Sequence, residues 1–417
     1  VIQQMMLTLK GKVVASGEAT AILLDAMLCA TKVYNGLIWH LRDELERTGK
    51  SKATRKNLNA VLKTLPRAKG YYSLSAQATR DEVIQAYNSF FALRKAGRTQ
   101  HQMPGFRRKT EYSPLRYYEG FGFTLEGDQL NLSLGTGRQD GVKSVSVALQ
   151  MRQDVAYQRI INVLITYDKE FGLCAHLVVE VKARQPLGNR KVAVDLGETQ
   201  AITAIFEDGA SLLYSGRLIK SIRRYWNKVR ARVKPPTAEN KRKSRRFRQI
   251  ERKESRQVQH LLHILTADFA RRCWLAGVDT IAIGDLTGIR ERIDYSDELN
   301  QRLHAWPFRK IVDMITYKAG LYGIQVVEVS EAYTSRACHA CGEVRKSNRK
   351  HRGLYVCACG WHVHADVNGA ANIFQNAYKV SPLIERSSGR VARPVVLPIR
   401  LGWHTVHETK SKVALAA

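Results

Sequence analysis

The spacing of apolar residues predicts a first strand followed by two long helices. Apolar and polar residues alternate over Met5–Val14, as in a strand. Apolar residues then recur at intervals of three and four positions over Thr20–Glu46 and again over Ser75–Ala96, which is the pattern of an amphipathic helix. The segment between the helices, Lys50–Lys69, is polar and basic, with a loop at Leu65-Pro66.

After Phe106 the pattern changes from helical spacing to short strands separated by Gly and Asp turns. The predicted strands cover residues 123–125, 130–134, 142–149, 160–167 and 173–181. Strands at this regular spacing favour a β-rich module, and we expect a barrel into which the two helices are inserted.

A third region alternates strands with helices and therefore predicts an α/β domain. Its strands are Val192–Leu196, which ends around an acid, then Ala201–Phe206, Asp279–Leu286 and Ile324–Val329. A helix follows from Asp366 to about residue 378. From residue 381 onward the chain is rich in Pro, Ser, Arg and Gly, and we expect a poorly ordered tail.

The most apolar stretch, Ala19–Ala30, is too short to cross a bilayer and carries Asp25. It lacks a basic leading segment and a cleavage site, so it predicts a buried helix and no signal peptide. We expect no membrane contact and a location in a reducing cytoplasm.

Four cysteines near the C-terminus predict a zinc ribbon. They form two close pairs, Cys338/Cys341 and Cys357/Cys359, on either side of a short basic insert. Thiolates suit tetrahedral Zn²⁺, and four of them leave no open position for catalysis. The second pair has a single residue between its cysteines, so a histidine is an alternative ligand; the candidates are His339, His362 and His364. Two disulfides are the other alternative, which a reducing compartment disfavours.

The charge of the chain indicates a polyanionic partner. Its 417 residues include 67 Lys and Arg against 37 Asp and Glu, which gives a formal net charge of +30. Such a charge favours nucleic acid through counterion release. Ribosomal and membrane-surface proteins share this property, but neither class explains a zinc ribbon followed by isolated acids.

Much of this charge lies in Arg217–Arg256, which has 17 Lys and Arg but 3 Glu, with aromatic residues between them. Pro235-Pro236 divides it into two helical halves. A solvated pair of surface helices is the ordinary interpretation of a charge run; the excess of positive charge favours a phosphate-binding hairpin. The candidate contacts are Arg223, Arg224, Arg230, Lys241, Arg242, Lys243, Arg245 and Arg246.

Two acids stand where a metal-dependent phosphodiesterase would need them. Asp195 ends an apolar strand, and Asp366 begins a helix far along the chain. Carboxylates that converge on a sheet can hold two Mg²⁺ ions, one to activate water and one to stabilise the leaving oxygen. Taken singly, each acid is equally typical of a turn or a helix cap.

The ordered set of short motifs resembles the TnpB family of transposon-encoded RNA-guided nucleases, which is ancestral to the miniature type V CRISPR effectors. The resemblance covers nearly the whole chain. It is carried by Gly70-Tyr-Tyr-Ser-Leu-Ser, Pro104-Gly-Phe-Arg, Val194-Asp-Leu-Gly, Leu303-His-Ala-Trp-Pro-Phe-Arg, Tyr317-Lys-Ala, Tyr333-Thr-Ser, both cysteine pairs and Ala365-Asp-Val-Asn-Gly-Ala-Ala-Asn-Ile.

The resemblance implies a multidomain α+β fold: a wedge β-barrel with an inserted helical recognition lobe, then a RuvC-type, RNase H-like α/β domain interrupted by the zinc ribbon. The implied boundaries are 1–18 and 104–188 for the wedge barrel, 19–103 for the recognition lobe, 189–332 and 365–380 for the RuvC-like domain, 333–364 for the ribbon and 381–417 for the tail. Asp195 matches the first catalytic acid of the family, and Asp366 matches the last.

The middle catalytic acid is where this chain departs from the family. The family has Glu-Asp-Leu after the strand that here contains Ile281, but this chain has Gly284-Asp285-Leu286. Asp285 does not substitute, because adjacent strand residues face opposite sides of a sheet. Either cleavage has been lost or another acid has moved in; we expect Glu291, ahead of Glu298, whereas an ion pair with a neighbouring arginine is the ordinary role for Glu291.

The predicted function is RNA-guided cleavage of double-stranded DNA beside a short adjacent motif, at a single Mg²⁺-dependent site, with structural Zn²⁺. The implied partners are a guide RNA and the target DNA, and the sequence gives no oligomeric state. The alternatives are a nuclease-inactive RNA-guided repressor, supported by Gly284, and a miniature type V CRISPR effector. A third hypothesis is a DNA-strand transferase of the RNase H-like class. It is disfavoured because the chain shows no full-length resemblance to that class.

Overall fold

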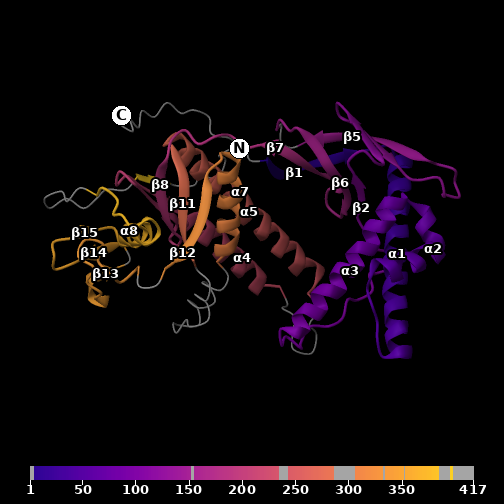
Figure 1. Ribbon diagram of the computed structural model, residues 1–417, viewed down its shortest axis with the longest axis horizontal. Coiled ribbons are helices and arrows are strands. Elements are labelled where there is room, and N and C mark those ends of the chain that lie inside the picture. The colour runs from indigo at the N-terminus through magenta and orange to yellow at the C-terminus, as the bar shows by residue number, and fades with distance from the viewer. Residues whose placement is uncertain are drawn as a thin grey trace. The chain divides into compact units, whose positions relative to one another are not determined.

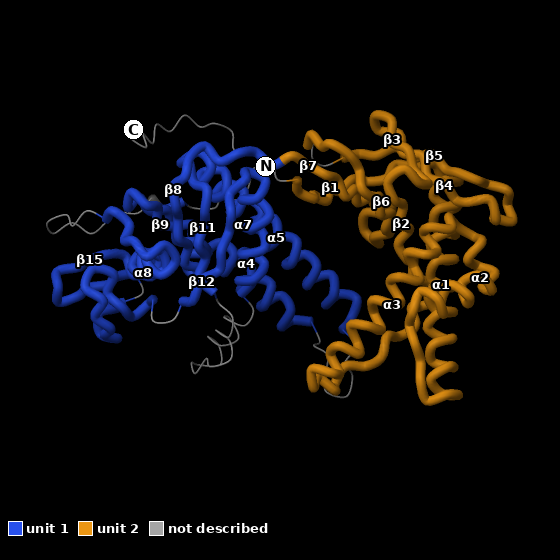
Figure 2. The backbone as a smooth tube through the Cα atoms, viewed as in Figure 1, with its two compact units in different colours: residues 1–3, 183–417 blue, residues 4–182 orange. Residues whose placement is uncertain are grey.

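The chain forms two compact units, one of residues 4–182 and one of residues 1–3 with 183–417 (Figure 2). The computed structural model describes residues 4–151, 155–233, 243–285, 306–331, 334–351, 353–384 and 395–397. Unit 2 is the N-terminal one, and unit 1 contains the four cysteines of the predicted ribbon together with Asp195 and Asp366.

Unit 2 is built on a seven-stranded antiparallel sheet in the order β2-β6-β7-β1-β5-β4-β3 (Figure 1). Its strands are β1 (Gln4–Val14), β2 (Leu115–Tyr118), β3 (Phe123–Glu126), β4 (Gln129–Ser133), β5 (Ser144–Met151), β6 (Arg159–Asp168) and β7 (Gly172–Lys182). A bridge between Tyr118 and Phe121 brings the two ends of the sheet together, so the sheet is a nearly closed barrel. The predicted strands of this module are confirmed, and the sequence missed β2.

The helices of unit 2 lie between β1 and β2 in the chain: α1 (Gly17–Thr48), α2 (Arg55–Thr64), a 3₁₀ helix (Pro66–Gly70) and α3 (Ser73–Lys95). Both predicted long helices are confirmed. The polar segment between them nevertheless folds, because α2 buries Leu58 and Leu62 and is capped by Thr54, whose side chain accepts a hydrogen bond from the backbone N–H of Asn57.

Helix α1 begins at its cap Ser16, which accepts from the backbone N–H of Ala19 at 3.1 Å. Among the described helices, α1 has the length and apolar character of a membrane span, but 56% of its most apolar window is buried inside the protein. A core helix has the same properties, and the buried side chains of Leu23, Met27 and Leu37 are those of a core.

Unit 1 contains a six-stranded sheet in the order β12-β11-β8-β9-β10-β16. Strands β8 (Arg190–Asp195), β9 (Gln200–Phe206) and β10 (Ser211–Ser215) form an antiparallel meander; β11 (Val278–Asp285) and β12 (Gln325–Ser330) add parallel to β8. The central strands are buried on both faces, which explains the unbroken apolar run Val192-Ala-Val.

Helices cover both faces of this sheet (Figure 1). One face packs on α5 (Arg245–Leu275) and α7 (Phe308–Leu321) through Val192, Val194 and Ile283. The other face packs on α8 (Ala365–Tyr378) through Ala193 and Ala282. Helix α4 (Arg217–Ala231) packs against α5. The sheet therefore separates a large apolar core from a second face on which α8 places Asp366.

The predicted ribbon is a small three-stranded antiparallel sheet of β13 (Arg349–His351), β14 (Leu354–Val356) and β15 (His362–Val363), preceded by a 3₁₀ turn (Lys346–Asn348). It lies between β12 and α8 in the chain.

Two described segments of the expected poorly ordered tail make contacts with the six-stranded sheet, and the rest of residues 381–417 lies outside the described residues. Val395–Leu397 forms β16, which pairs in parallel with β10 at the edge of the six-stranded sheet. Leu383 also donates its backbone N–H to the carbonyl of Glu207. These contacts are long-range, so local composition did not reveal them.

Candidate functional site: a carboxylate cluster beside a four-cysteine ribbon

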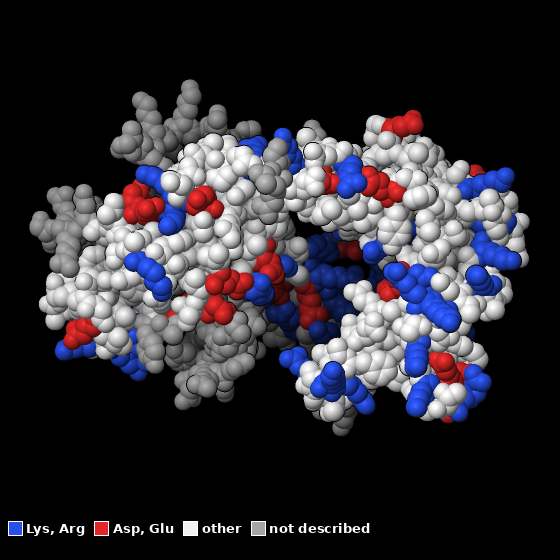
Figure 3. Space-filling model, in the orientation of Figure 1, with Lys and Arg blue, Asp and Glu red and all other residues white. Residues whose placement is uncertain are grey.

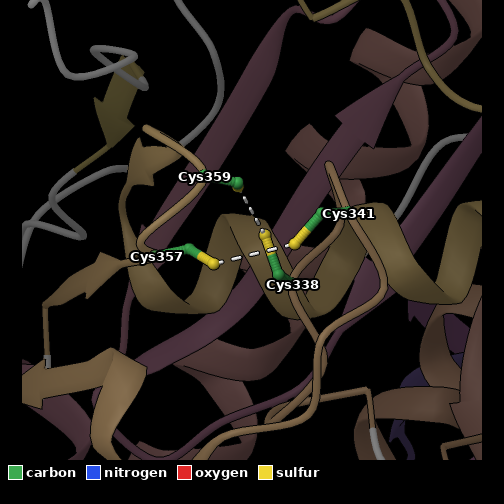
Figure 4. Close-up of side chains that lie close together, drawn as sticks. All are labelled: Cys338, Cys341, Cys357 and Cys359. Carbon is green, nitrogen blue, oxygen red and sulfur yellow. Dashed lines mark hydrogen bonds between the residues drawn. The ribbon is translucent and has the colours of Figure 1, made fainter.

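The four predicted cysteines converge in unit 1 (Figure 4). Their sulfurs lie within 4.8 Å of one another, and the Cys338–Cys359 and Cys341–Cys357 Sγ–Sγ distances are both 3.7 Å. These separations fit a tetrahedral S₄ site and exceed a disulfide bond. All four cysteines are free thiols, so the four-cysteine set is confirmed as a cluster that can hold zinc.

The histidine alternatives do not join this cluster within the described part of the chain. His364 instead caps α8, where its Nδ1 accepts a hydrogen bond from the backbone N–H of Asp366 at 3.3 Å. His339 packs beside Trp361, with ring centroids 6.0 Å apart.

Two buried asparagines of α8 join the ribbon to the helix. The Oδ1 of Asn368 accepts from the backbone N–H of His339 and from Nε1 of Trp361, both at 3.1 Å, and its Nδ2 donates to the carbonyl of Ala337. One turn later, Nδ2 of Asn372 donates to the same carbonyl and to that of Thr334. The Asn/Ala-rich helix sequence thus has a physical reason: its amides bind the backbone of the first cysteine loop, and its alanines allow close packing.

We predict that Asn368→Ala destabilises the ribbon by about 3 kcal/mol, because it leaves two buried N–H groups and a carbonyl without this partner. The measurement is the rate at which zinc passes to a chromogenic chelator, together with urea unfolding; both should show a loosened ribbon. Asn376→Ala on the exposed side of α8 is the control and should change the stability by less than about 0.5 kcal/mol. Equal zinc-loss rates in the two variants would contradict this role.

Asp195 is held at the end of β8, against α8. Its Oδ2 would lie 2.8 Å from a Cβ added at Gly369, so the absence of a side chain at Gly369 lets the helix approach the carboxylate. Burial, followed by the charge of Asp366, raises the pKa of Asp195 to about 7, and the Arg349 guanidinium opposes this shift. A buried carboxylate with a raised pKa is poised to bind a cation.

The third acid of the cluster is Glu331, which the sequence analysis missed. It follows β12 directly, and the two-residue alternation places Val327, Val329 and Glu331 on the α8 face of the sheet. Burial, then the charges of Asp195 and Asp285, raise the pKa of Glu331 to about 8. Its Oε1 is buried and has no hydrogen-bond partner among the described residues.

Gly284 provides the space that Glu331 occupies. The parallel register pairs Gly284 with Val329, and Ile283 with Val194, so Gly284 lies level with Asp195 on the next strand. A Cβ added at Gly284 would overlap the Glu331 carboxyl group. A side chain at position 284 and the observed Glu331 would therefore compete for one volume.

Asp195, Glu331 and Asp366 line one cavity of about 260 Å³. Arg349 of the ribbon also lines it, and its Nη2 lies 2.9 Å from Oδ1 of Asp366. Glu198 is a fourth acid at this cavity and forms an ion pair with Lys220 at 3.4 Å. Four acids thus line one cavity, and one of them has a buried oxygen without a hydrogen-bond partner among the described residues. The carboxylate oxygens of Asp195, Glu331 and Asp366 do not all lie within 4.8 Å of one another, so they are oxygen donors spread around one volume, the ligand type that hard divalent cations prefer.

Two of the other acids considered from sequence, Glu291 and Glu298, lie outside the described residues. Asp285 follows Gly284 and, by strand alternation, faces the side of the sheet opposite to Asp195, as predicted. The sequence signal for Glu331 was its place at the end of an alternating strand, and the structure added that this strand lies beside β11, which carries Gly284.

The described residues of the predicted basic segment form α4 and the start of α5, and a cavity of about 1300 Å³ lies beside them. Arg223, Arg224 and Arg230 line this cavity, but Glu254 forms ion pairs with Arg223, at 3.7 Å, and with Arg230. Figure 3 shows acidic side chains among the basic ones in this region. The arginines are thus partly neutralised across the helix pair, which a search for acids on the same helix face could not reveal.

Further along this segment, Lys243 forms an ion pair with Glu251 at 2.7 Å, and Arg245 and Arg246 are exposed in the first turn of α5. Lys241 and Arg242 lie outside the described residues.

Comparison with known proteins agrees with this architecture. Residues 176–290 match the family model described as a probable transposase, and residues 308–373 match that of the Cas12f1-like TNB domain. The cryo-EM structure of a Cas12f1–sgRNA–target DNA complex has the same fold over 89% of this chain and 98% of that one, with a TM-score of 0.58 and 15% identity. The fold is therefore that of the compact Cas12f-type effectors.

Two individual relatives are similar to this chain over part of its length. The chain is 31% identical over 210 residues to the TnpB-like protein ORF457 of Acidianus two-tailed virus, covering 48% of this chain and 44% of the relative. It is 37% identical over 98 residues to the CRISPR-associated endodeoxyribonuclease Cas12f1 of Sulfoacidibacillus thermotolerans, covering 23% and 22%. These matches span less than half of either relative.

A longer match, at 22% identity, covers 73% of this chain and 74% of the putative RNA-guided DNA endonuclease InsQ of Escherichia coli K12. The similarity to the TnpB family predicted from the motifs is confirmed.

Proposed function

We propose that this chain is an RNA-guided DNA endonuclease with a single RuvC-like active site formed by Asp195, Glu331 and Asp366. The observation that carries the proposal is the convergence of these three carboxylates, with Gly284 leaving the space that Glu331 fills. A chain that had lost cleavage would have no reason to retain a buried, unpartnered carboxyl oxygen at this place. The names of the similar proteins, TnpB-like, Cas12f1 and RNA-guided endonuclease, support the same activity.

The three carboxylates would hold Mg²⁺. Bound there, Mg²⁺ supplies an activated water and stabilises the departing oxygen of the phosphodiester. The chain's own contribution is to fix the ligands: β8 and Gly369 position Asp195, β12 and Gly284 position Glu331, and the His364 cap fixes the first turn of α8 that carries Asp366. The positive end of α8 also favours the carboxylate in its first turn.

The zinc ribbon has a structural role in this proposal. Four thiolates leave no open coordination position, so the zinc holds the ribbon and, through Asn368 and Asn372, the N-terminal part of α8. Residues of the ribbon border the carboxylate cavity and would meet the DNA strand as it enters.

A guide RNA would supply sequence specificity by pairing with one strand of double-stranded target DNA, beside a short motif read by the protein. The protein would hold the heteroduplex by its backbone, with α4 and α5 as one contact surface. In its cell the protein would act in the prokaryotic cytoplasm, where the thiolates stay reduced.

Charge reversal at Arg245 and Arg246 should weaken binding of many DNA sequences alike, because phosphate contacts carry no base information. For the guide-loaded Asp195→Ala protein, the double change to Glu should reduce the slope of log affinity against log salt by about two. Binding titrations at several salt concentrations measure this. Arg309→Glu, which removes a charge already paired with Asp313 and Glu328, is the control. Unchanged affinity and slope would show that this segment is a solvated surface.

The second candidate is a nuclease-inactive RNA-guided repressor, favoured by the glycine at position 284. A miniature CRISPR effector differs from a transposon-encoded nuclease in the source of its guide. The deciding experiment is to sequence the RNA that copurifies with the protein and then to test cleavage of a matched plasmid with Mg²⁺ or Mn²⁺. Cleavage that Asp195→Ala abolishes supports the nuclease; guide-dependent binding without cleavage supports the repressor.

A further inference from the structure

Within the described residues, the chain passes from unit 2 to unit 1 once, between Lys182 and Ala183. On the unit 2 side, β7 stays paired up to its last residue, because Lys182 lies opposite Gln4 of β1. On the unit 1 side, the backbone N–H of Arg184 donates to the carbonyl of Leu321 at 2.9 Å. Ala183 is therefore the one residue between two anchored ends, and it is itself buried.

An aromatic clamp holds the start of the next segment, residues 184–190, which we call the strap. The guanidinium of Arg184 lies 5.2 Å from the ring centroid of Trp274 and 5.5 Å from that of Tyr322, as in a cation–π contact. The two rings stack with their centroids 5.3 Å apart. Trp274 also donates its Nε1–H to the carbonyl of Gln185 at 2.8 Å. The strap is thus bound to the C-terminal ends of α5 and α7 together.

Three glycines let the strap lie against the turns that lead into β11 and β12. A Cβ added at Gly323 would lie 2.4 Å from the carbonyl oxygen of Arg184, and one added at Gly188 would lie 2.8 Å from that of Gly277. Gly277 and Gly323 both have φ of 74°, which other residues rarely adopt. At the end of the strap, Arg190 donates its backbone N–H to the carbonyl of Gly277 at 3.0 Å. These contacts make the strap a built part of unit 1.

The composition of the strap is that of a flexible linker, since it contains Pro186 and Gly188 between polar residues. Its contacts give it the opposite property. With β7 paired to its end and the strap fixed from Arg184, the junction has little more than the φ and ψ angles of Ala183, because peptide bonds are planar. One residue spans about 3.8 Å between successive Cα atoms. Such a junction permits rotation about one point and prevents the two chain segments that meet there from moving apart.

We propose that Ala183 is a single-residue hinge between the two units and that the Arg184 clamp keeps this hinge short. Its effect on cleavage rests on the proposed function. A target held with the help of unit 2 must present one strand to the carboxylate cavity of unit 1, and a short hinge restricts which phosphates of that strand the cavity can reach. A longer junction would lower the effective concentration of the strand at the cavity and spread the cut over more positions.

The first test measures amide hydrogen exchange in the RNA-free, zinc-loaded full chain. Peptides that cover the strap should be protected in wild type, and Arg184→Ala should speed their exchange about tenfold or more, because the strap opens locally. Exchange in β8 should not change. Arg184→Lys keeps the positive charge and should restore part of the protection. Leu187→Ala is the matched control, since Leu187 lies in the same strap with 59% exposure, and it should exchange like wild type.

The second test lengthens the hinge by inserting Gly-Ser between Lys182 and Ala183, which adds up to about 7 Å of chain. Single-turnover cleavage by the guide-loaded protein should fall about tenfold, and the cut positions, mapped by sequencing, should spread along the strand. Guide-dependent DNA binding should stay within about twofold of wild type. The same insertion after Lys169, in the exposed turn between β6 and β7, is the control and should change neither the rate nor the cut positions.

The two tests separate failure of the hinge from failure of the proposed function. Strap amides that exchange in wild type as fast as in an unstructured peptide would show that the hinge assignment is wrong, whatever the protein cleaves. A protected strap, together with an insertion variant that cuts at the wild-type rate and positions, would also overturn it. Loss of DNA binding along with cleavage in the insertion variant would show a merely structural junction. If wild type does not cleave a matched target, the proposed function is wrong, and hydrogen exchange still decides the hinge.

Discussion

Glu331→Gln should reduce DNA cleavage about a thousandfold while leaving guide-dependent DNA binding intact. The change keeps the size of the side chain but removes the negative charge that a cation at Asp195 and Glu331 would need, a loss of about 4 kcal/mol of transition-state stabilisation. The measurement is single-turnover plasmid cleavage with the copurified RNA, with binding measured in parallel. Glu328→Gln, an exposed-side acid of β12 that pairs with Arg309, is the matched control and should cleave normally.

Moving the carboxylate from position 331 to position 284 tests the role of Glu331 more directly. Gly284→Glu alone should impair folding or cleavage, because the new side chain would overlap Glu331. The double change Gly284→Glu with Glu331→Gly moves the carboxylate back to the adjacent strand and should recover part of the activity that Glu331→Gly loses. Such recovery is difficult to explain unless both positions serve one site.

Cleavage by variants of the acids considered from sequence shows which acid is the third ligand. Glu291→Ala and Glu298→Ala should cleave within a few-fold of wild type if Glu331 is the third ligand. If Glu291→Ala abolishes cleavage and Glu331→Gln does not, the third carboxylate is that of Glu291. If wild type does not cleave and Gly284→Glu with Glu331→Gly does, the protein is a repressor.

Cys338→Ser with Cys341→Ser should release the zinc and unfold the ribbon. Structural zinc sites contribute about 10 kcal/mol or more to the folding of small modules, and the hydrogen bonds of Asn368 and Asn372 depend on the backbone of the first cysteine loop. Wild type should contain one zinc per chain by elemental analysis, and the variant none. Cleavage should fall with the zinc content, because Arg349 and the first turn of α8 lose their support.

Cys174→Ala is the control for this prediction, since Cys174 is a buried free thiol in unit 2. Its zinc content should remain that of wild type. If wild-type protein purified without a chelator contains no zinc, the assignment of the four cysteines as a zinc site is wrong. Retention of zinc by the Ser variant would show that other ligands, such as His339, hold it.

Local sequence patterns determined most elements of this fold. Period-two alternation located β1, short apolar runs bounded by turn residues located most of the other strands but not β2, β10 or β16, helical spacing located α1 and α3, and thiolate chemistry singled out the four cysteines. These properties depend on residues close together in the chain, or on a ligand type whose chemistry restricts the metal. Asp195 and Asp366 were recognisable as candidate cation ligands because their signals are also local. Asp195 ends an apolar run, and Asp366 begins a helix.

Only the tertiary structure decided which acid accompanies them. Glu331 and Gly284 lie 47 positions apart in the sequence but compete for one volume, because β11 and β12 are parallel neighbours with Gly284 beside Val329. Likewise, the contact of Arg349 with Asp366 requires the ribbon to fold back over α8, and β16 requires a partner strand far earlier in the chain. Strand register and the packing of one module on another set these distances, and neither is written in the pattern of any single segment.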